Sequence, residues 1–175
     1  MKFERKHELD LSPKDHEELS EHIGAAFAEN SASPGDRSFF FQPPHMRIIC
    51  RIGDDLAGHL AIYLRTVRVG EQNTQTAAIG DVSVAKAYRR KGIASQLVKE
   101  ALEIAEDIEL DFVWLAGDEQ LYFDAGFFSA ENEVTRISWD TGQTITNKTH
   151  DMLVHDLDGW DWDQDASVNL LGPML

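Results

Sequence analysis

The spacing of apolar residues predicts one helix near the start of the chain. Ser12 can cap this helix, and Pro13 suits its first turn. Apolar residues then recur at helical spacing, at Leu19, Ile23 and Phe27. We expect the helix to end near Asn30 and Ser31, because Pro34 disfavours helical geometry in the residue before it.

From Met46 onward the pattern becomes extended. Two turns that contain glycine, at residues 53–55 and 70–73, separate three apolar segments. These segments are Met46–Ile52, Leu56–Val69 and Thr74–Val84. Strands joined by turns this short pair antiparallel. The pattern therefore predicts an antiparallel meander.

A helix and a strand follow the meander. Apolar residues recur at helical spacing from Ile93 to Ala105, and Asp111–Leu115 is a short apolar strand. Strand, helix and strand in this order form a crossover, which implies a parallel pair. A helical turn is expected over residues 119–124, and strands over residues 134–139 and 152–157. The expected fold class is α+β, a mixed α/β sandwich in a single domain over residues 1–175.

Composition favours a globular protein. Hydrophobic residues make up 42% of the chain and charged residues 27%. No apolar run reaches the roughly 18 residues of a membrane span, and the first residues lack the apolar core of a secretory signal. The one cysteine, Cys50, lies in an apolar run and is predicted to be a buried strand thiol. We therefore expect a cytoplasmic protein without membrane contact.

The net charge of −15 changes the picture of possible partners. Such a charge repels nucleic acid phosphates, which excludes nucleic acid as a partner, and favours cationic ligands. A solvated acidic surface that serves solubility is the alternative interpretation.

Against this acidic background, three cations gather where the meander meets the next helix. Arg89, Arg90 and Lys91 follow the strand that ends at Val84, and the helix is expected to begin near Arg90. Free N–H groups in a first helical turn, together with the helix dipole, favour an anion by roughly 0.3–1 kcal/mol. Gly92 leaves room for a phosphate to approach. Solvation of the helix start explains these cations poorly, because they oppose the dipole. This segment between strand and helix is therefore predicted to be a phosphate-binding site.

Residues Arg89–Ala94 resemble the Arg/Gln-x-x-Gly-x-Gly/Ala signature of the GNAT acyltransferase superfamily. Their position between the strand Ile79–Val84 and an amphipathic helix fits that superfamily. Leu121–Phe127 looks like its Tyr-x-x-x-Gly-Phe element. The resemblance covers residues 46–128 and implies the GNAT fold and an acyl-CoA-dependent N-acyltransferase.

The resemblance also implies roles for individual residues. It implies acetyl-CoA as co-substrate, bound by Val82, Ser83, Val84, Arg89, Arg90, Lys91, Gly92, Ile93, Ala94 and Ser95. The strand residues would meet the pantetheine arm, and the amides from Arg90 to Ser95 the pyrophosphate. Tyr122 would lie beside the sulfur as general acid, because a phenol with a pKa of about 10 is protonated at neutral pH. Its alternative role is core packing.

The general base is not evident. Many members of the superfamily carry a glutamate on the strand before the signature, where this chain has Ala78 and Gly80. Asp81 is the nearest carboxylate, although strict alternation turns it to the opposite face unless a bulge intervenes. His59 titrates in the right range, but a strand histidine is more often structural. A water relay to a distant carboxylate is the third alternative.

Three further short stretches indicate which kind of amine accepts the acyl group. Arg37–Phe39, Asp55–Arg65 and Trp160–Pro173 look like nodulation acyltransferases and aminoglycoside 2'-N-acetyltransferases, which acylate amino sugars. This resemblance implies a small, cationic, amino-sugar-like primary amine. The acidic segment at residues 156–165, with its tryptophans, either binds such a cation by charge and stacking or packs against the sheet.

Several alternatives stay open at this stage. The chain could bind acyl-CoA without catalysis, or it could use a longer acyl donor. Histidine spacing predicts no metal site. The sequence leaves the oligomeric state open, a homodimer included.

Overall fold

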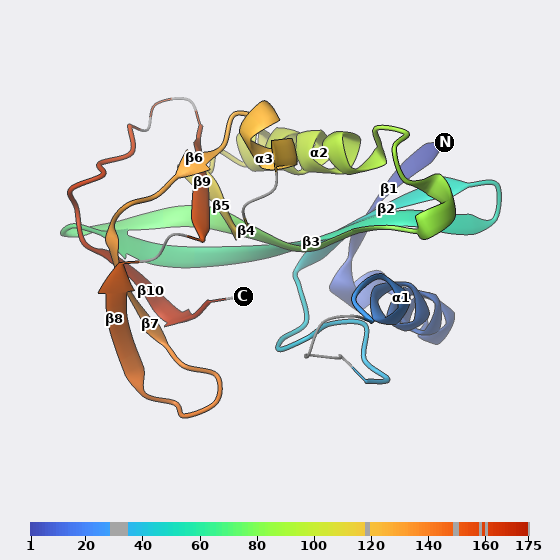
Figure 1. Cartoon of the computed structure of the whole chain (residues 1–175), viewed down its shortest axis with the longest axis horizontal. Helices are drawn as coiled ribbons and strands as arrows, with labels where there is room; N and C mark the ends of the chain where they lie inside the picture. The colour runs from blue at the N-terminus through green and yellow to red at the C-terminus, as the bar shows by residue number, and fades with distance from the viewer. Residues whose placement is uncertain (29–34, 118–119, 149–150, 158, 160, 175) are drawn as a thin grey trace. The chain divides into compact units, whose positions relative to one another are not determined.

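The computed structural model describes residues 1–28, 35–117, 120–148, 151–157, 159 and 161–174. These residues form two compact units (Figure 1). Unit 1 contains Met1–Tyr63 and Ile79–Ala101, and unit 2 contains Leu64–Ala78 and Leu102–Leu175. Two long strands and one helix run from one unit into the other. The single domain predicted for residues 1–175 stays a prediction.

Unit 1 is an antiparallel sheet with a helix on each face (Figure 1). Its elements are β1 (Lys2–His7), the 3-10 turn η1 (Glu8–Asp10), α1 (Pro13–Ala26), β2 (Met46–Ile52), the first part of β3 (Asp55–Val69), the end of β4 (Gln72–Val84), the 3-10 turn η2 (Lys86–Tyr88) and the start of α2 (Ile93–Asp107). Strand β2 pairs antiparallel with both β1 and β3. This pairing confirms the first hairpin of the predicted meander.

Helix α1 begins as predicted and ends earlier than predicted. The Ser12 side chain accepts a hydrogen bond from the Asp15 backbone, and the Asp15 carboxylate accepts one from the Ser12 backbone. The predicted end near Asn30 and Ser31 is wrong, because α1 stops at Ala26; residues 30 and 31 themselves lie outside the described part of the chain. Phe27 leaves helical geometry and packs edge-on against the Phe40 ring, 5.4 Å away. That contact comes from tertiary structure, which the local pattern does not contain.

Strand β1 was not predicted from the sequence. Its residues are mostly charged and carry no apolar alternation, yet all six pair with β2, from Lys2 opposite Arg51 to His7 opposite Met46. Backbone hydrogen bonds form regardless of side-chain polarity, so a polar strand can add to the edge of a sheet whose core lies elsewhere.

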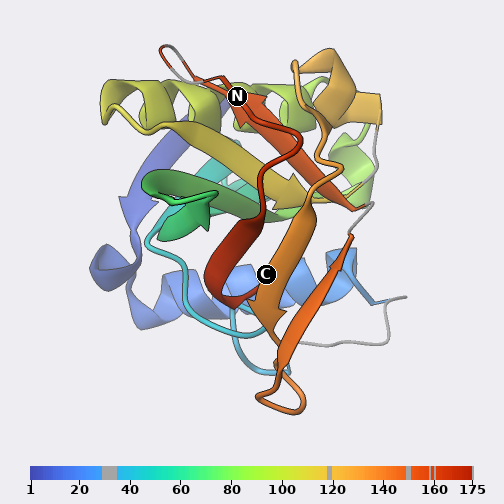
Figure 2. The ribbon, with the colours of Figure 1, turned by 90° about the vertical axis from the view of Figure 1, so that its left-hand side faces the viewer.

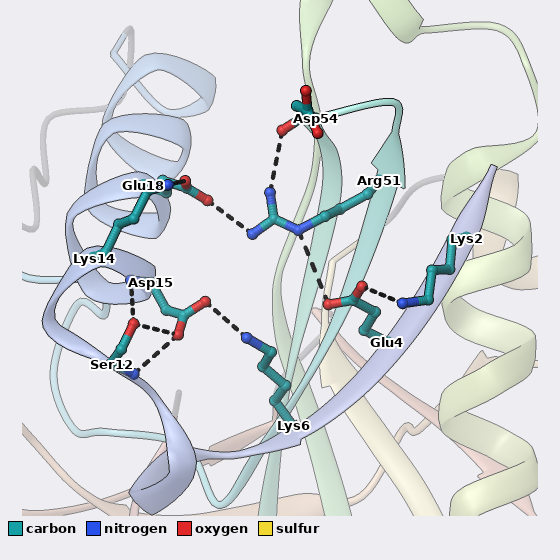
Figure 3. Close-up of polar contacts among 9 residues, drawn as sticks. All are labelled: Lys2, Glu4, Lys6, Ser12, Lys14, Asp15, Glu18, Arg51 and Asp54. Carbon is teal, nitrogen blue, oxygen red and sulfur yellow. Dashed lines mark hydrogen bonds and ion pairs between the residues drawn. The ribbon is translucent and has the colours of Figure 1, made fainter.

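Charged side chains join α1 to β1 and β2 (Figure 3). Lys6 Nζ of β1 lies 2.7 Å from Asp15 Oδ1 of α1. Arg51 Nη2 of β2 lies 2.8 Å from Glu18 Oε2 of α1, and Arg51 Nε lies 3.9 Å from Glu4 Oε2 of β1. The cluster therefore holds the first turns of α1 to the outer edge of the sheet.

We expect acid to weaken this cluster. Hydrogen bonds from Lys6 and then Ser12 hold the pKa of Asp15 well below its usual range. A carboxyl whose folded pKa is depressed stabilises the fold above its unfolded pKa of about 4, and this contribution is lost as the pH falls through the folded pKa. Asp15→Asn is therefore expected to lower the free energy of unfolding by about 1 kcal/mol at pH 7 and by less at pH 3.

Urea unfolding at the two pH values measures this difference. The exposed Glu17 of the same helix provides the matched control, and Glu17→Gln is expected to change little at either pH. An equal loss for Asp15→Asn at pH 7 and pH 3 would contradict the prediction.

Unit 2 is a mixed sheet. Its elements are the second part of β3, the first part of β4, the end of α2, β5 (Phe112–Ala116), α3 (Gln120–Asp124), β6 (Phe128–Ser129), β7 (Glu133–Ile137), β8 (Thr144–Lys148), β9 (Met152–Asp156) and β10 (Val168–Pro173). The strand order is β6-β9-β5-β4-β3-β10-β7-β8, with the β7–β8 hairpin at one edge (Figure 2). Strands β4 and β5 are parallel, which confirms the predicted crossover.

Three strands of unit 2 were not predicted, namely β6, β8 and β10. Strand β10 lies between β3 and β7, antiparallel to the first and parallel to the second. Arg65 Nη1 and Nη2 donate to the backbone oxygens of Pro173 and Leu170, at 2.7 and 2.9 Å. The end of the chain is thus held by an arginine more than a hundred residues earlier, which no local pattern reveals.

Two further expectations concern the core and the membrane. Cys50 is fully buried on β2, as predicted, and burial raises the pKa of its thiol. Within the described ranges, no helix has the length and apolarity to cross a membrane.

Candidate active site

The predicted phosphate-binding segment forms an exposed loop ahead of α2. The helix begins at Ile93, so the predicted start near Arg90 is wrong by three residues. Arg90 and Gly92 both have positive φ, at 62° and 75°, which excludes them from a right-handed helix. The Gly92 carbonyl accepts from the Gln96 N–H at 3.0 Å and so opens the helix. The N–H groups of the first turn then point toward the loop.

The loop cations are available to a ligand. Arg89, Arg90 and Lys91 are all exposed, and no carboxylate pairs with any of them in the part of the chain that the structure describes. Arg89 Nε donates to the Val84 carbonyl at 3.2 Å, and Lys91 Nζ lies 5.0 Å from the centre of the Tyr88 ring. A Cβ on Gly92 would meet nothing within 4 Å. This open, cationic helix start suits an anion.

Close packing holds α2 against β3 directly beneath this loop. A Cβ on Gly58 would lie 2.7 Å from Cγ2 of Ile93 and 3.3 Å from the Ser83 carbonyl oxygen. Only glycine therefore allows the first turn of α2 to approach the sheet this closely. The predicted phosphate-binding segment is held in place by this contact as well as by its own sequence.

A pocket of about 430 Å³ lies between α1 and the end of β4. It is lined by His22, Ala25, Ala26, Ala28, Val84, Ala85, Lys86 and Arg89. The ring of His22 also hydrogen bonds to the strand, with Nε2 3.1 Å from Ser83 Oγ, and burial lowers its pKa. Sequence reasoning missed this pocket, because α1 and the end of β4 are separated by some sixty residues.

Asp81 interrupts the alternation of β4. Its φ of 53° lies in the left-handed region, which costs a non-glycine residue roughly 1–2 kcal/mol. A single left-handed residue thus breaks the strict alternation expected for this strand. The Asp81 carboxylate accepts a hydrogen bond from the Tyr63 hydroxyl at 3.1 Å, and burial raises the pKa of this carboxyl.

His59 is fully buried beside Asp81. Its Nε2 lies 3.2 Å from Nη1 of Arg47, and its Nδ1 lies 3.1 Å from the Asp81 carbonyl oxygen. Burial, and next the Arg47 charge, hold the pKa of His59 well below its usual range. Both ring nitrogens are engaged, which leaves neither available to a substrate amine.

Tyr122 belongs to unit 2, whereas all the other predicted site residues belong to unit 1. It lies on α3, largely buried, with its ring 6.1 Å from that of Phe127. The Phe127 N–H donates to the Tyr122 carbonyl, and the Gly126 N–H donates to the Phe123 carbonyl, each at 3.0 Å. This is a Schellman motif with Gly126 in the left-handed position, at φ 88°. The spacing of tyrosine, glycine and phenylalanine is that of a helix end.

Three residues around Asp81 were missed at the sequence level. Arg47 is fully buried, Tyr63 nearly so, and Glu8 pairs with Arg47 at 2.6 Å. The signal available for Arg47 was a lone charge inside the apolar run of β2, since a buried charge requires partners. No local pattern indicates which residues those partners are.

The acidic segment near the end of the chain is held by its tryptophan. Trp162 packs edge-on against Phe112 at 4.9 Å, and its Nε1 donates to Asn132 Oδ1 at 2.9 Å. Asp161, Asp163 and Asp165 are exposed. Asp158 and Trp160 lie outside the described residues. Of the two interpretations of this segment, the contacts of Trp162 match packing against the sheet.

Metal ligands do not gather around these residues. Over the described ranges, no three histidine, cysteine, aspartate or glutamate side chains lie close enough to hold an ion. The absence of a metal from the reaction stays a prediction.

The sequence and the fold each resemble known proteins. Residues 10–127 match the family described as the acetyltransferase (GNAT) domain. No curated protein matches the chain in sequence.

Solved structures resemble the fold over nearly its whole length. A GNAT family acetyltransferase from Brucella melitensis, solved in complex with acetyl-CoA, is 18% identical, with 95% of this chain and 94% of that chain covered and a TM-score of 0.65. An acyl-CoA N-acyltransferase from Pseudomonas aeruginosa is 20% identical, with coverage of 88% and 98% and a TM-score of 0.62. The Escherichia coli GNAT family N-acetyltransferase YhbS, in complex with CoA, is 17% identical, with coverage of 97% and 90% and a TM-score of 0.62.

These likenesses confirm the predicted fold class. They do not show the resemblance to aminoglycoside 2'-N-acetyltransferases and nodulation acyltransferases, which stays a prediction. The family match spans α1, the meander, the phosphate-binding loop, α2 and the Schellman motif that ends α3. The chain belongs to the GNAT acetyltransferase family and is an acyl-CoA-dependent N-acetyltransferase.

Proposed function

We propose that the protein transfers the acetyl group of acetyl-CoA to a primary amine of a small, cationic acceptor. The observation that carries this proposal is the loop of three exposed cations that no carboxylate pairs with in the described structure, at the start of α2. In a chain of net charge −15, such cations favour a strongly anionic ligand. The pyrophosphate of coenzyme A is such a ligand.

The residues of the loop fit this co-substrate. The first-turn amides of Ile93, Ala94 and Ser95 would hold phosphate oxygens, and the open space at Gly92 admits them. Arg89, Arg90 and Lys91 would add charge. The backbone of Val82, Ser83 and Val84 would hydrogen bond to the pantetheine arm, as the resemblance of this segment implies.

Asp81 is the proposed general base. Its carboxylate is hydrogen bonded to Tyr63, and the raised pKa brings it closer to the range in which a carboxylate accepts protons effectively. It takes one proton from the attacking nitrogen as the N–C bond forms. His59, the other candidate base, is not proposed for this role, because its ring nitrogens are engaged by Arg47 and the Asp81 carbonyl.

Tyr122 is the proposed general acid, on the strength of the family resemblance. It gives its phenolic proton to the sulfur as the C–S bond breaks. The products are an N-acetylated amine and free coenzyme A. Exchange with solvent then removes the proton from Asp81 and returns one to Tyr122, so that protons balance over the cycle.

The acidic surface supports a cationic acceptor. Asp161, Asp163 and Asp165 point into solvent and would attract a polyamine or amino sugar over distance. A screen of thiol release from acetyl-CoA tests the proposal, with amino sugars, aminoglycosides, polyamines, amino acids and peptide N-termini as acceptors. Longer acyl-CoA donors, run in parallel, test the chain length. Binding of acetyl-CoA with no thiol release from any amine would favour the non-catalytic alternative.

Replacing the proposed base gives a sharper result. Asp81→Asn is expected to lower kcat by roughly 10²- to 10⁴-fold, while the Kd for coenzyme A changes little. Thiol-release kinetics and calorimetric binding measure the two quantities. Asp54→Asn, in the exposed turn before β3, is the control and is expected to keep full activity. An Asp81→Asn protein with unchanged kcat would exclude Asp81 as the base.

A further inference from the structure

Three donors converge on the left-handed residue of β4. The Asp81 carbonyl oxygen accepts from His59 Nδ1 at 3.1 Å and from the Ser83 hydroxyl at 3.2 Å. The carboxylate accepts from the Tyr63 hydroxyl at 3.1 Å. A non-glycine residue at a φ of 53° persists only where its surroundings determine it. These hydrogen bonds hold Asp81 in the left-handed conformation.

The tautomer of His59 is fixed by its other neighbour. Arginine can only donate hydrogen bonds, so His59 Nε2 must accept from Arg47 Nη1. In the neutral ring, the proton then resides on Nδ1, which donates it to the Asp81 carbonyl. The bond to Asp81 therefore depends on Arg47 as well as on His59.

Arg47 is itself completely satisfied. Its Nε and Nη2 donate to the two carboxylate oxygens of Glu8 at 2.6 and 3.0 Å. Its Nη1 donates to the Ser38 carbonyl at 2.8 Å, and Nη2 also lies 3.2 Å from Ser38 Oγ. With the bond to His59, these contacts match all five N–H groups of a guanidinium. Arg47 and His59 are both wholly buried, so the pair is a rigid support.

We infer that His59 is a positioning residue, which acts through Asp81. By holding the Asp81 carbonyl on one side of β4, it keeps the residue left-handed and its carboxyl directed at Tyr63 instead of the position that regular alternation would give. This inference rests on the proposed role of Asp81 as general base. In this role the buried Arg47–His59 pair would serve the reaction indirectly, by holding the base in position, and would touch neither substrate.

Two amide substitutions separate the two hydrogen bonds of the ring. The amide nitrogen of asparagine is three bonds from Cα, as Nδ1 of histidine is, so His59→Asn can keep the donor to the Asp81 carbonyl. The amide oxygen of glutamine is four bonds from Cα, as Nε2 is, so His59→Gln can keep the acceptor for Arg47 and loses the donor to Asp81. Both variants lose the ring, which makes each the matched control for the other in stability.

Two measurements distinguish positioning from a merely structural role. Thiol-release kinetics are expected to show kcat at least tenfold lower for His59→Gln than for His59→Asn, at similar melting temperatures. Carboxyl ¹³C NMR can be measured without an amine substrate. In His59→Gln the pKa of Asp81 is expected to move toward the ordinary aspartate range, whereas in His59→Asn it is expected to stay raised. Among the described residues, the titratable and charged groups around Asp81 are Tyr63 and His59 from β3, Arg47 from β2 with its partner Glu8, and His22 from α1 through Ser83.

The outcomes are separable from those of the proposed function. Equal kcat values and equal Asp81 titrations in the two His59 variants would overturn the positioning role, whatever the base is. An unchanged kcat in Asp81→Asn would exclude Asp81 as the general base. The NMR comparison would still decide whether His59 positions Asp81. If His59→Gln does not fold, Ser83→Ala removes the second donor to the same carbonyl and is expected to move the Asp81 titration in the same direction; no movement there would overturn the inference.

Discussion

Replacing Arg47 with methionine is expected to lower the free energy of unfolding by about 3–5 kcal/mol. The guanidinium is fully buried, and its removal leaves the Glu8 carboxylate, the Ser38 carbonyl and His59 Nε2 without their donor. Desolvated groups that lose their partners cost more than the pair itself contributed. Against a total stability of about 5–15 kcal/mol, this loss is large enough to be seen in any unfolding experiment.

Urea unfolding followed by circular dichroism measures this effect. Arg51 supplies the matched control, because it lies on the same strand and pairs with Glu18 and Glu4 nearer the surface. Arg51→Met is expected to cost about 1 kcal/mol or less. Adding Glu8→Gln to Arg47→Met is expected to restore part of the loss, since the unpaired charge is then removed. Equal costs for the two arginines would refute the buried network as a source of stability.

Tyr122→Phe is expected to lower kcat by roughly 10²- to 10⁴-fold. The substitution removes only the phenolic oxygen and keeps the ring that packs against Phe127. If the phenol protonates the departing sulfur, kcat falls while the Kd for acetyl-CoA stays the same. Thiol-release kinetics and calorimetric binding measure the two quantities.

A second acyl donor, with a different thiol leaving group, makes this test more specific. An acetyl thioester of a more acidic thiol needs little protonation as it leaves, so the loss caused by Tyr122→Phe is expected to shrink with that donor. Phe123→Ala, a substitution of an exposed side chain on the same helix, is the control and is expected to keep normal kinetics. A loss that is the same with both thioesters would assign Tyr122 to packing instead of proton transfer.

Local sequence motifs were predicted well where neighbouring residues satisfy one another. Ser12, which was predicted to cap α1, exchanges hydrogen bonds with Asp15, and α3 ends at Asp124, where the predicted helical turn ends. Turns that contain glycine marked the ends of the long strands of the meander. In contrast, the polar strands β1 and β8 carry no apolar period. Only their pairing with neighbouring strands in the structure identifies them.

The candidate site shows the same division. The cations and Gly92 of the phosphate-binding loop were evident from the sequence, whereas the helix start was misplaced because positive φ values at Arg90 and Gly92 delay it to Ile93. Asp81 could be named only as the nearest carboxylate. Its left-handed conformation, which decides where the carboxyl points, depends on hydrogen bonds from residues that are distant in the chain.

The sequence by itself determined the meander, the crossover, the cationic loop before α2 and the family, because each depends on residues within a few positions of one another. Only the tertiary structure decided how Asp81 is held, since its support runs from Glu8 through Arg47 to His59. Buried polar groups must find partners wherever the fold places them. That requirement couples residues more than seventy positions apart and leaves no periodic trace in the chain.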